Sequence, residues 1–232
     1  LATVSGDTLI LNMGPNAIDR LNGDTRDGNE LFEVDYENGD IRVRSGALGV
    51  NDWQVYGKDE TDSGSFSHVI ALGGQGNDAV TFEDFDATNI TFDLQGGVGD
   101  DIIEFIEDLG VTAATGAGAV IRGGAGNDRL VGGHLDDEIY GGLGNDVIEG
   151  GRGYDVLFGD EGDYQKQVVD GNEHSINTRI SGLDGDDELS GGDDDDILIG
   201  GGGEDVLRGD DGRAVILGDA GRFGFNLVDG HL

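Results

Sequence analysis

Aspartate recurs at one fixed place in a nine-residue pattern, Gly-Gly-x-Gly-x-Asp-x-U-x, where U is Val, Ile or Leu. Nine copies span residues 73–81, 96–104, 123–131, 132–140, 141–149, 150–158, 182–190, 191–199 and 200–208. Position 6 is aspartate in every copy, as Asp78, Asp101, Asp128, Asp137, Asp146, Asp155, Asp187, Asp196 and Asp205. Carboxylate oxygens are ligands that hard divalent cations prefer, so this spacing predicts metal binding.

Positions 4 and 5 add further oxygen atoms. Position 5 is Asn or Asp in seven copies, as Asn77, Asp100, Asn127, Asp136, Asn145, Asp186 and Asp195, and the exceptions are Tyr154 and Glu204. Glycine at positions 1, 2 and 4 permits positive φ and close backbone approach, which predicts a tight turn with converging carbonyls. We therefore count the turn glycines Gly126, Gly144, Gly153, Gly185 and Gly203 among the predicted ligands. Flexible, carbonyl-rich turns suit Ca²⁺ better than Mg²⁺.

The elements that position these residues are turns and short strands. The first six residues of each copy predict a turn, and positions 7–9 predict a strand with position 8 pointing inward. Two copies then make one rung of a flattened solenoid, about 18 residues long, and turns 18 residues apart stack. Positions 5 and 6 point to opposite sides and therefore face the neighbouring turns below and above. Stacked carboxylates repel one another unless a cation lies between them.

Departures from the pattern predict longer rungs and weak points. The spacings from 73 to 96 and from 96 to 123 predict rungs of 23 and 27 residues, with 90–94 and 119–122 as their far strands. Leu135 and Asp194 stand at position 4, where a left-handed residue other than glycine costs about 1–2 kcal/mol. We expect glycine at position 135 to relieve this strain. Degenerate copies begin at 159, 209 and 218 without Asp at position 6, so ligation is expected to lapse near 159–181 and after 209.

The repeats resemble those of the RTX (repeats-in-toxin) family, whose signature is this nonapeptide. The resemblance covers residues 73–217 with gaps. It implies an all-β fold, a parallel β-solenoid or β-roll, with Ca²⁺ held between stacked turns. Carried over, full sites join turn 123–128 with 141–146, turn 132–137 with 150–155, and turn 182–187 with 200–205. The implied cofactor is Ca²⁺, at about five to eight ions.

The chain divides into segments of different character. Residues 1–72 carry no clear repeat and alternate apolar and polar residues, which predicts strands that form irregular rungs or a cap. Residues 73–122 form long rungs, 123–163 a first run of repeats, 164–181 an insertion, and 182–217 a second run. Residues 218–232 resemble residues from 159 onward, an offset of 59 that indicates a super-repeat and a longer array. The insertion is a side hairpin or, alternatively, a protruding recognition loop.

Charge and composition exclude several functions. The net charge of −36 opposes nucleic-acid binding, which requires basic surface. The sequence has no apolar run of transmembrane length and no cysteine. It contains neither H-E-x-x-H nor G-x-S-x-G, and its four histidines are scattered, so no enzyme activity is expected. Flexible linkers are also rich in glycine, but they do not need apolar residues at a fixed phase.

These observations lead to one expected function and two alternatives. The expected function is calcium-dependent folding and stiffening of a large secreted bacterial protein, such as an adhesin, filament or surface-layer protein at the cell surface. The resemblance also allows the accessory calcium module of an exported protease, lipase or epimerase. A polysaccharide-binding module is the third possibility and would need exposed aromatic side chains. Expected partners are calcium and, beyond it, further copies of the chain or surface polysaccharide.

Overall fold

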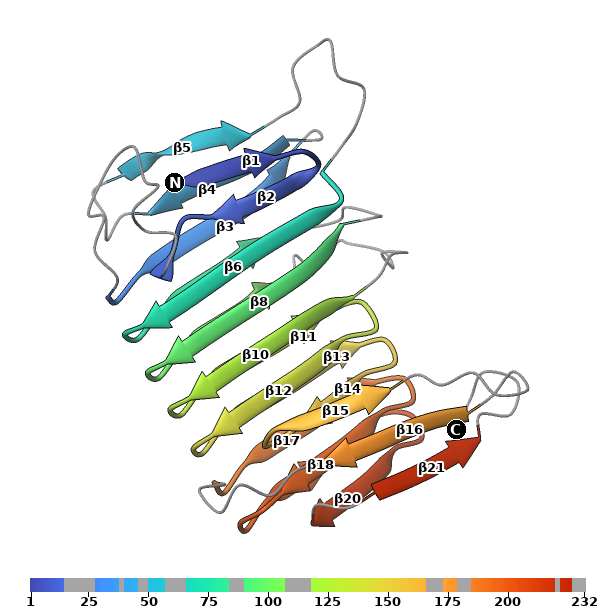
Figure 1. Ribbon diagram of the computed structural model, residues 1–232. Coiled ribbons are helices and arrows are strands. Elements are labelled where there is room, and N and C mark those ends of the chain that lie inside the picture. Colours follow the sequence, from blue (N-terminus) through green and yellow to red (C-terminus); the bar gives the residue numbers. More distant parts are fainter. Residues whose placement is uncertain are drawn as a thin grey trace.

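The chain winds as a solenoid between two facing sheets (Figure 1). The computed structural model describes residues 1–14, 28–37, 40–45, 50–56, 66–83, 90–106, 118–165, 173–178, 185–219 and 222–226. Sheet A contains, in spatial order, β1 (Ala2–Ser5), β2 (Thr8–Leu11), β6 (His68–Gln75), β8 (Thr91–Val98), β10 (Ala119–Ala125), β12 (Glu138–Leu143), β14 (Val156–Phe158), β18 (Ile197–Gly201) and β20 (Val215–Asp219). Sheet B contains β19 (Val206–Arg208), β17 (Glu188–Asp193), β13 (Val147–Arg152), β11 (Arg129–Gly133), β9 (Ile102–Ile106), β7 (Ala79–Glu83), β3 (Leu31–Glu37), β4 (Asp40–Ser45) and β5 (Val50–Tyr56). The predicted all-β parallel solenoid is confirmed.

Successive rungs align their repeats. Leu130 pairs with Ile148 in parallel strands, and the aspartates of their turns lie 18 residues apart. The longer rungs have offsets of 23 and 27 residues, as the spacing predicts. Ile148 in turn pairs with Leu189 across an offset of 41 residues. Both runs of repeats therefore belong to one continuous solenoid, and the chain between β14 and β17 is an enlarged turn.

Apolar side chains fill the space between the sheets. The inward residues at position 8 are buried from Val80 to Leu198, and Leu207 near the last rung is partly buried. N-terminal strands bury two residues each, such as Leu9 and Leu11 of β2, whereas a repeat strand such as β13 buries one apolar side chain, Ile148. Each buried aliphatic or aromatic side chain contributes about 1.5–3 kcal/mol. The N-terminal rungs therefore have the stronger apolar core.

Residues 1–72 supply both a first rung and extra end strands. Strands β2 and β3 run parallel to β6 and β7, and so continue the solenoid. Strand β1 is antiparallel to β2, and β4 and β5 extend sheet B in antiparallel fashion. Arg44 binds Glu33 on β3, and its guanidinium lies 4.3 Å from the Trp53 ring centroid. The described part of this segment thus contains parallel solenoid strands and antiparallel end strands.

The strands reach further into the repeats than the sequence predicts. Strand β12 covers positions 7–9 of one copy and continues through Gly141–Leu143, positions 1–3 of the next. The prediction that the first six residues form no strand is therefore wrong. Positive φ is confined to positions 2 and 4, with 115° at Gly142 and 123° at Gly144. Position 1 keeps a strand-compatible backbone, so its glycine provides space for neighbouring atoms.

The two departures at position 4 behave differently. Leu135 does not adopt positive φ, so the predicted strain at this residue is wrong. Asp194 occupies the same position with φ of 80° and keeps the left-handed backbone of the repeat. Gly182 and Leu183, predicted to start a copy, lie outside the described residues.

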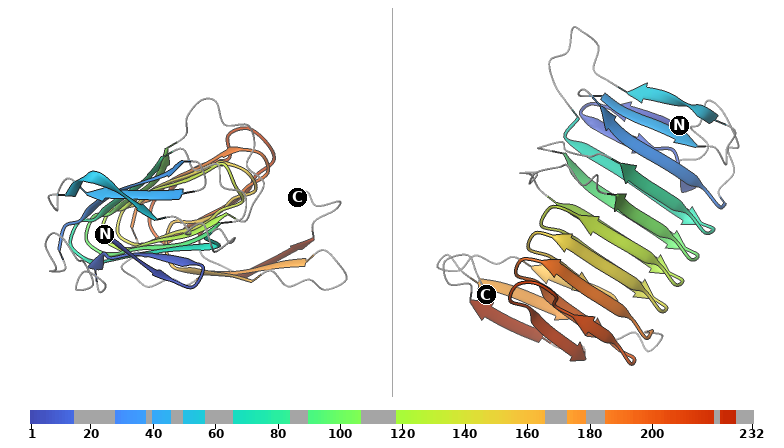
Figure 2. Two further views of the ribbon diagram at one scale, coloured as in Figure 1. Left: turned by 90° about the horizontal axis from the view of Figure 1, so that it is seen from above. Right: turned by 180° about the vertical axis from the view of Figure 1, so that it is seen from behind.

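A third, smaller sheet lies along the outer face of sheet A (Figures 1 and 2). It consists of β15 (Gly162–Gln165), β16 (Glu173–Thr178) and β21 (Arg222–Asn226), and its strands are antiparallel. Tyr164 and Phe223, which are related by the 59-residue offset, both pair with Ile176. The described part of the insertion is therefore a hairpin, and the super-repeat recurs in space.

Outward-facing residues of sheet A form a second apolar cluster on the side where this sheet lies. Buried members are Tyr140, Val156, Phe158, Ile197 and Ile199. The Tyr140 and Phe158 rings stack with centroids 4.8 Å apart. Among the described residues, no helix is long and apolar enough to cross a membrane.

Replacing Asp194 with glycine tests the geometry of position 4. We expect Asp194→Gly to stabilise the folded chain by about 1 kcal/mol, because glycine adopts this φ without strain. The matched variant Leu135→Gly should destabilise it by about 0.5–1 kcal/mol, because flexibility increases with no strain to relieve. Urea unfolding of both variants checks this. Stabilisation by Leu135→Gly would contradict the backbone described here.

Candidate metal centre

The aspartate-containing turns form two stacks, one at each edge of the solenoid. The first stack contains turns 73–78, 96–101, 123–128, 141–146 and 200–205, together with Asp187. The second stack contains turns 132–137, 150–155 and 191–196. The structure thus brings together the turns that the 18-residue spacing predicts as neighbours, and it joins 73–78 and 96–101 to the first stack.

Position-6 aspartates form a ladder in which each carboxylate binds the preceding rung. Each Oδ1 accepts the backbone N–H of the aspartate one rung earlier. The donor–acceptor distances are 2.7–3.1 Å for Asp78 to Asp101, Asp101 to Asp128, Asp128 to Asp146, Asp146 to Asp187 and Asp187 to Asp205. The second stack repeats this from Asp137 to Asp155 and from Asp155 to Asp196. One oxygen of each carboxylate is therefore committed to the backbone.

The other oxygen is left for a different ligand. Oδ2 is buried and has no hydrogen-bond partner in Asp101, Asp128, Asp137, Asp146, Asp155, Asp187 and Asp196. Leaving a buried charged oxygen unsatisfied costs several kcal/mol, so native structures pair such atoms. A row of these oxygens on successive rungs fits a row of bound cations.

Position-1 glycines line the cradle next to each Oδ2. A Cβ placed on Gly123 would meet Oδ2 of Asp128 and the carbonyl oxygen of Gly141 one rung later. Equivalent pairs of oxygens surround Gly96, Gly132, Gly141, Gly150 and Gly200. Only glycine leaves this space open, so carboxylate and carbonyl oxygens converge there.

Side chains alone do not complete a metal site. Within the described ranges, no three His, Asp or Glu side chains gather closely enough to hold an ion. A cation would therefore take one or two carboxylates and fill its remaining positions with backbone carbonyls or water. Mixed oxygen coordination of this kind suits Ca²⁺, which takes six to eight oxygen ligands.

Position-5 residues form a second ladder on the exposed side of the turns. Here each side-chain Oδ1 accepts the N–H of the following rung, as from Asn127 to Asp100 at 2.9 Å and from Asn145 to Asn127 at 2.9 Å. The same ladder includes Asn77, Asp136, Asp186 and Asp195. Positions 5 and 6 thus face opposite neighbours, as predicted. Position-5 side chains differ from position 6 in being mostly exposed.

Position-4 glycines carry the backbone of one turn onto the next. The carbonyl of Gly126 lies where a Cβ of Gly144 would be, and the carbonyl of Gly144 lies likewise against Gly185. Gly153 and Gly203 make the same contact with Leu135 and Gly185. Of these glycines, Gly126, Gly144, Gly153 and Gly203 have φ between 110° and 142°.

Sequence reasoning missed one turn of the first stack. Glu30 donates its N–H to Asp78 Oδ1 at 2.7 Å, and Asn29 Oδ1 accepts the N–H of Asn77 at 3.0 Å. Residues 28–33, Gly-Asn-Glu-Leu-Phe-Glu, therefore occupy positions 4–9 with Glu at position 6. Glu30 Oε2 accepts the Gly14 N–H at 2.9 Å. Requiring Asp at position 6 hid this copy.

Sequence reasoning also misplaced the start of the copy that contains Asp187. Gly159 holds position 1, because its carbonyl accepts the Gly142 N–H at 2.9 Å and its Cβ site faces Asp187 Oδ2. Ligation is expected from the sequence to lapse near 159–181, whereas the structure places Gly159 and Asp187 in one turn. The degenerate copy that begins at Gly159 is completed by Gly185–Asp187 after the insertion.

Burial raises the pKa of the position-6 carboxyls. Loss of hydration is the largest cause, neighbouring carboxylates add to it, and the backbone N–H donor lowers it. The pKa is about 6 for Asp101, about 7 for Asp128, Asp187 and Asp196, about 8 for Asp137 and Asp146, and about 9 for Asp155. Without a cation, the folded turns therefore favour protonated carboxyls near neutral pH.

Comparison with known families agrees with this geometry. Residues 115–148, 135–165 and 181–216 match the model of the RTX calcium-binding nonapeptide repeat (4 copies). The resemblance seen in the sequence is confirmed for residues 115–165 and 181–216. Comparisons with curated proteins and with solved structures found no match.

The raised pKa values predict that acid stabilises the calcium-free fold. A carboxyl whose pKa is raised in the folded state stabilises it fully below about pH 4, its unfolded value, and loses this contribution as pH rises through the folded value. In EDTA, we expect the folding equilibrium constant to fall more than tenfold between pH 5 and pH 9. Urea unfolding followed by circular dichroism measures this.

Two variants separate the buried carboxyls from the overall charge. Asp137→Asn removes one raised pKa and should reduce the pH dependence, whereas Glu149→Gln removes one negative charge at an exposed strand position and should leave it nearly unchanged. Equal pH dependence in the two variants would assign the effect to net charge.

Proposed function

We propose that this chain, whose residues 115–165 and 181–216 match the RTX calcium-binding nonapeptide repeat, is a structural segment of a large secreted bacterial protein that folds and stiffens on binding calcium. The observation that carries the proposal is the row of buried, unpartnered Oδ2 atoms in the stacked turns. Calcium supplies the positive charge that such a row requires.

Linkage makes this arrangement a folding switch. The oxygens converge only when successive rungs are stacked, so the folded chain binds the ion and the unfolded chain does not. A ligand that binds only the folded state stabilises it in proportion to the logarithm of its concentration. About five to eight divalent ions would supply about +10 to +16 against the net charge of −36.

Calcium concentration supports an extracellular location. Calcium sensors inside cells work at micromolar levels, whereas extracellular modules bind at about 10⁻⁴–10⁻³ M. We propose that the chain stays unfolded inside the cell and folds outside, on the bacterial surface. Its role there is as part of an adhesin, filament or surface-layer protein.

We propose no catalytic role for these residues, because the sequence contains neither H-E-x-x-H nor G-x-S-x-G. A polysaccharide-binding role has less support. Tyr140 and Phe158 are 7% and 1% exposed and belong to the second apolar cluster, and the partly buried Tyr154 packs against the same cluster. They therefore do not offer an open stacking platform to a sugar.

The first experiment is a calcium titration of the whole chain. In EDTA at pH 8 we expect weak β signal in far-UV circular dichroism, and a cooperative increase as calcium rises to about 10 mM. Magnesium at the same concentration should not substitute. A chain that is fully β-structured in EDTA, or disordered with calcium, would contradict the proposed function.

A paired substitution locates the ligands. We expect Asp146→Ala to raise the calcium midpoint about tenfold and to lower cooperativity, because Asp146 connects two rungs of the first stack. Glu149→Gln removes the same charge at an exposed position on the same rung and should leave the midpoint unchanged. Tryptophan fluorescence and circular dichroism measure both. Equal midpoints for the two variants would show that Asp146 is no ligand.

A further inference from the structure

We propose that the enlarged turn between β14 and β17 is a split calcium site, in which Asp160 is an additional ligand and Gly159–Asp160 and Gly185–Asp187 close together around one ion. Ion binding there fastens the base of residues 161–184, and so fixes the hairpin β15–β16 on the outer face of sheet A. This inference rests on the proposed calcium-binding function and extends it to a segment outside the repeat pattern.

Neighbouring rungs hold both halves of the split turn. On the entering side, Gly159 donates its N–H to the Ile199 carbonyl at 2.9 Å. On the returning side, Asp186 donates to Asn145 Oδ1 at 3.1 Å, and Asp146 donates to Asp187 Oδ1 at 2.8 Å. The two halves therefore occupy positions 1–2 and 4–6 of one turn, although the insertion separates them in sequence.

An unpartnered buried oxygen points into this turn. Asp187 is 2% exposed, and its Oδ2 has no hydrogen-bond partner. A Cβ on Gly159 would meet that Oδ2 and the Gly200 carbonyl oxygen. The split turn thus reproduces the cradle of the continuous turn around Gly123, but its glycine lies before the insertion and its carboxylate lies after it.

Asp160 replaces a missing backbone oxygen. In continuous turns, the position-2 carbonyl lies against the position-2 glycine of the following rung, as Gly124 does against Gly142. At the split turn, the place next to Gly201 where this carbonyl oxygen would lie is occupied by Oδ2 of Asp160. Asp160 lacks positive φ, so its backbone leaves the turn path here. Its carboxylate keeps an oxygen at this place and adds a negative charge.

The charge of Asp160 lies within the ligand shell. It is 2% exposed, and it interacts repulsively with Asp146 and Asp187. Its Oδ2 also accepts the Gly202 N–H at 2.5 Å. Without a cation, this level of the first stack therefore contains one more repelling carboxylate than the continuous turns. An ion of charge +2 would convert that repulsion into attraction.

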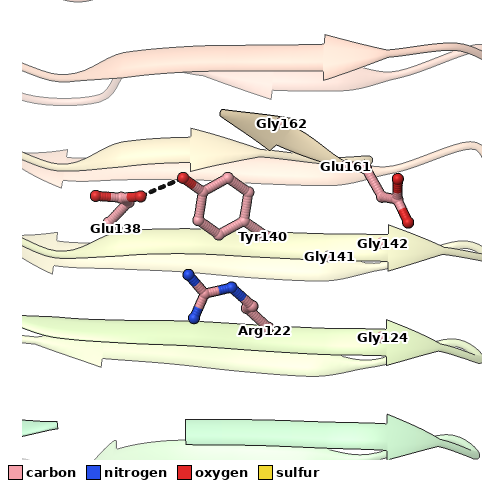
Figure 3. Close-up of a pocket in the computed structure, with 8 residues that line it drawn as sticks. All are labelled: Arg122, Gly124, Glu138, Tyr140, Gly141, Gly142, Glu161 and Gly162. Atoms are coloured by element: carbon pink, nitrogen blue, oxygen red, sulfur yellow. Dashed lines mark hydrogen bonds between the residues drawn. The ribbon is translucent and has the colours of Figure 1, made fainter. Parts of the chain in front are cut away.

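The hairpin begins two residues after Asp160. Gly162 starts β15, and a Cβ on it would meet the ring of Phe158. Glu161, Gly162 and Tyr140 line one cavity of about 440 Å³ (Figure 3). Tyr140 donates a hydrogen bond to Glu138 at this cavity. The split turn thus sets where the hairpin meets the second apolar cluster. Closing a long loop with a metal removes much of its freedom.

Limited proteolysis of the full chain during a calcium titration tests this proposal. Trypsin sites at Lys166 and Arg179 lie within the insertion. In the wild-type chain, calcium should protect them. In Asp160→Asn and Asp187→Asn, the calcium concentration for half-protection should rise about tenfold. Glu161→Gln, which removes an adjacent exposed charge, should leave it unchanged. Equal half-protection in Asp160→Asn and wild type would overturn the role of Asp160.

Two comparisons keep the outcomes distinct. Calorimetry with calcium should show one weakened site in Asp128→Asn, a continuous turn, with little change in protection of the insertion. A variant in which Gly-Ser replaces residues 160–184 restores a continuous turn and should keep the wild-type number of calcium ions. A higher number would overturn the split site even if Asp187→Asn fails to fold, because it would mean that the wild-type split turn holds no ion. Absence of calcium binding in the wild type would instead overturn the proposed function.

Discussion

Repulsion between buried carboxylates in register is the constraint on which the solenoid depends. From Asp101 to Asp187, successive rungs of the first stack place aspartates directly above one another, away from water. A backbone N–H binds one oxygen of each carboxylate, and the other oxygen is buried near the charges of neighbouring carboxylates without a hydrogen-bond partner. Ordinary apolar burial opposes this only weakly, because the repeat strands bury few large side chains. A divalent ion between rungs would turn this repulsion into attraction. Without an ion, the same burial and repulsion raise the pKa of these carboxyls, so that protons are bound instead.

The two ladders explain why positions 5 and 6 tolerate different residues. Position 6 must present a charged oxygen to the interior, so it is aspartate in all nine copies. Position 5 works at the surface and accepts one N–H from the following rung. Tyr154 and Glu204 still donate their own N–H groups to Asp136 and Asp186. Tyr154 and Glu204 therefore keep the hydrogen bond to the preceding rung and lack only the Oδ1 that would accept from the following rung.

The molecule combines two sources of stability along its length. The N-terminal rungs have a broad apolar core with packed aromatic rings, such as Phe82 and Phe105 with ring centroids 4.6 Å apart, and Glu30 Oε2 in their turn accepts the Gly14 N–H. The repeat rungs have a narrow core and unsatisfied carboxylates. On their outer side, the third sheet lies along a second apolar cluster. Apolar packing thus dominates at one end, whereas the other end is built around carboxylate-lined turns.

Repeat spacing alone predicts the solenoid, the rungs of 18, 23 and 27 residues and the position of every repeat aspartate, because each follows from a pattern of residues close in sequence; it does not predict the 41-residue offset across the insertion. It also determined that position 8 is the core position. Other features depended on contacts between distant residues. The union of Gly159 with Asp187 requires a closed turn across an insertion, and the role of Glu30 requires Asp78 of the next rung to accept its N–H. These residues come together only in the folded chain, because the nine-residue spacing does not relate residues on the two sides of an insertion.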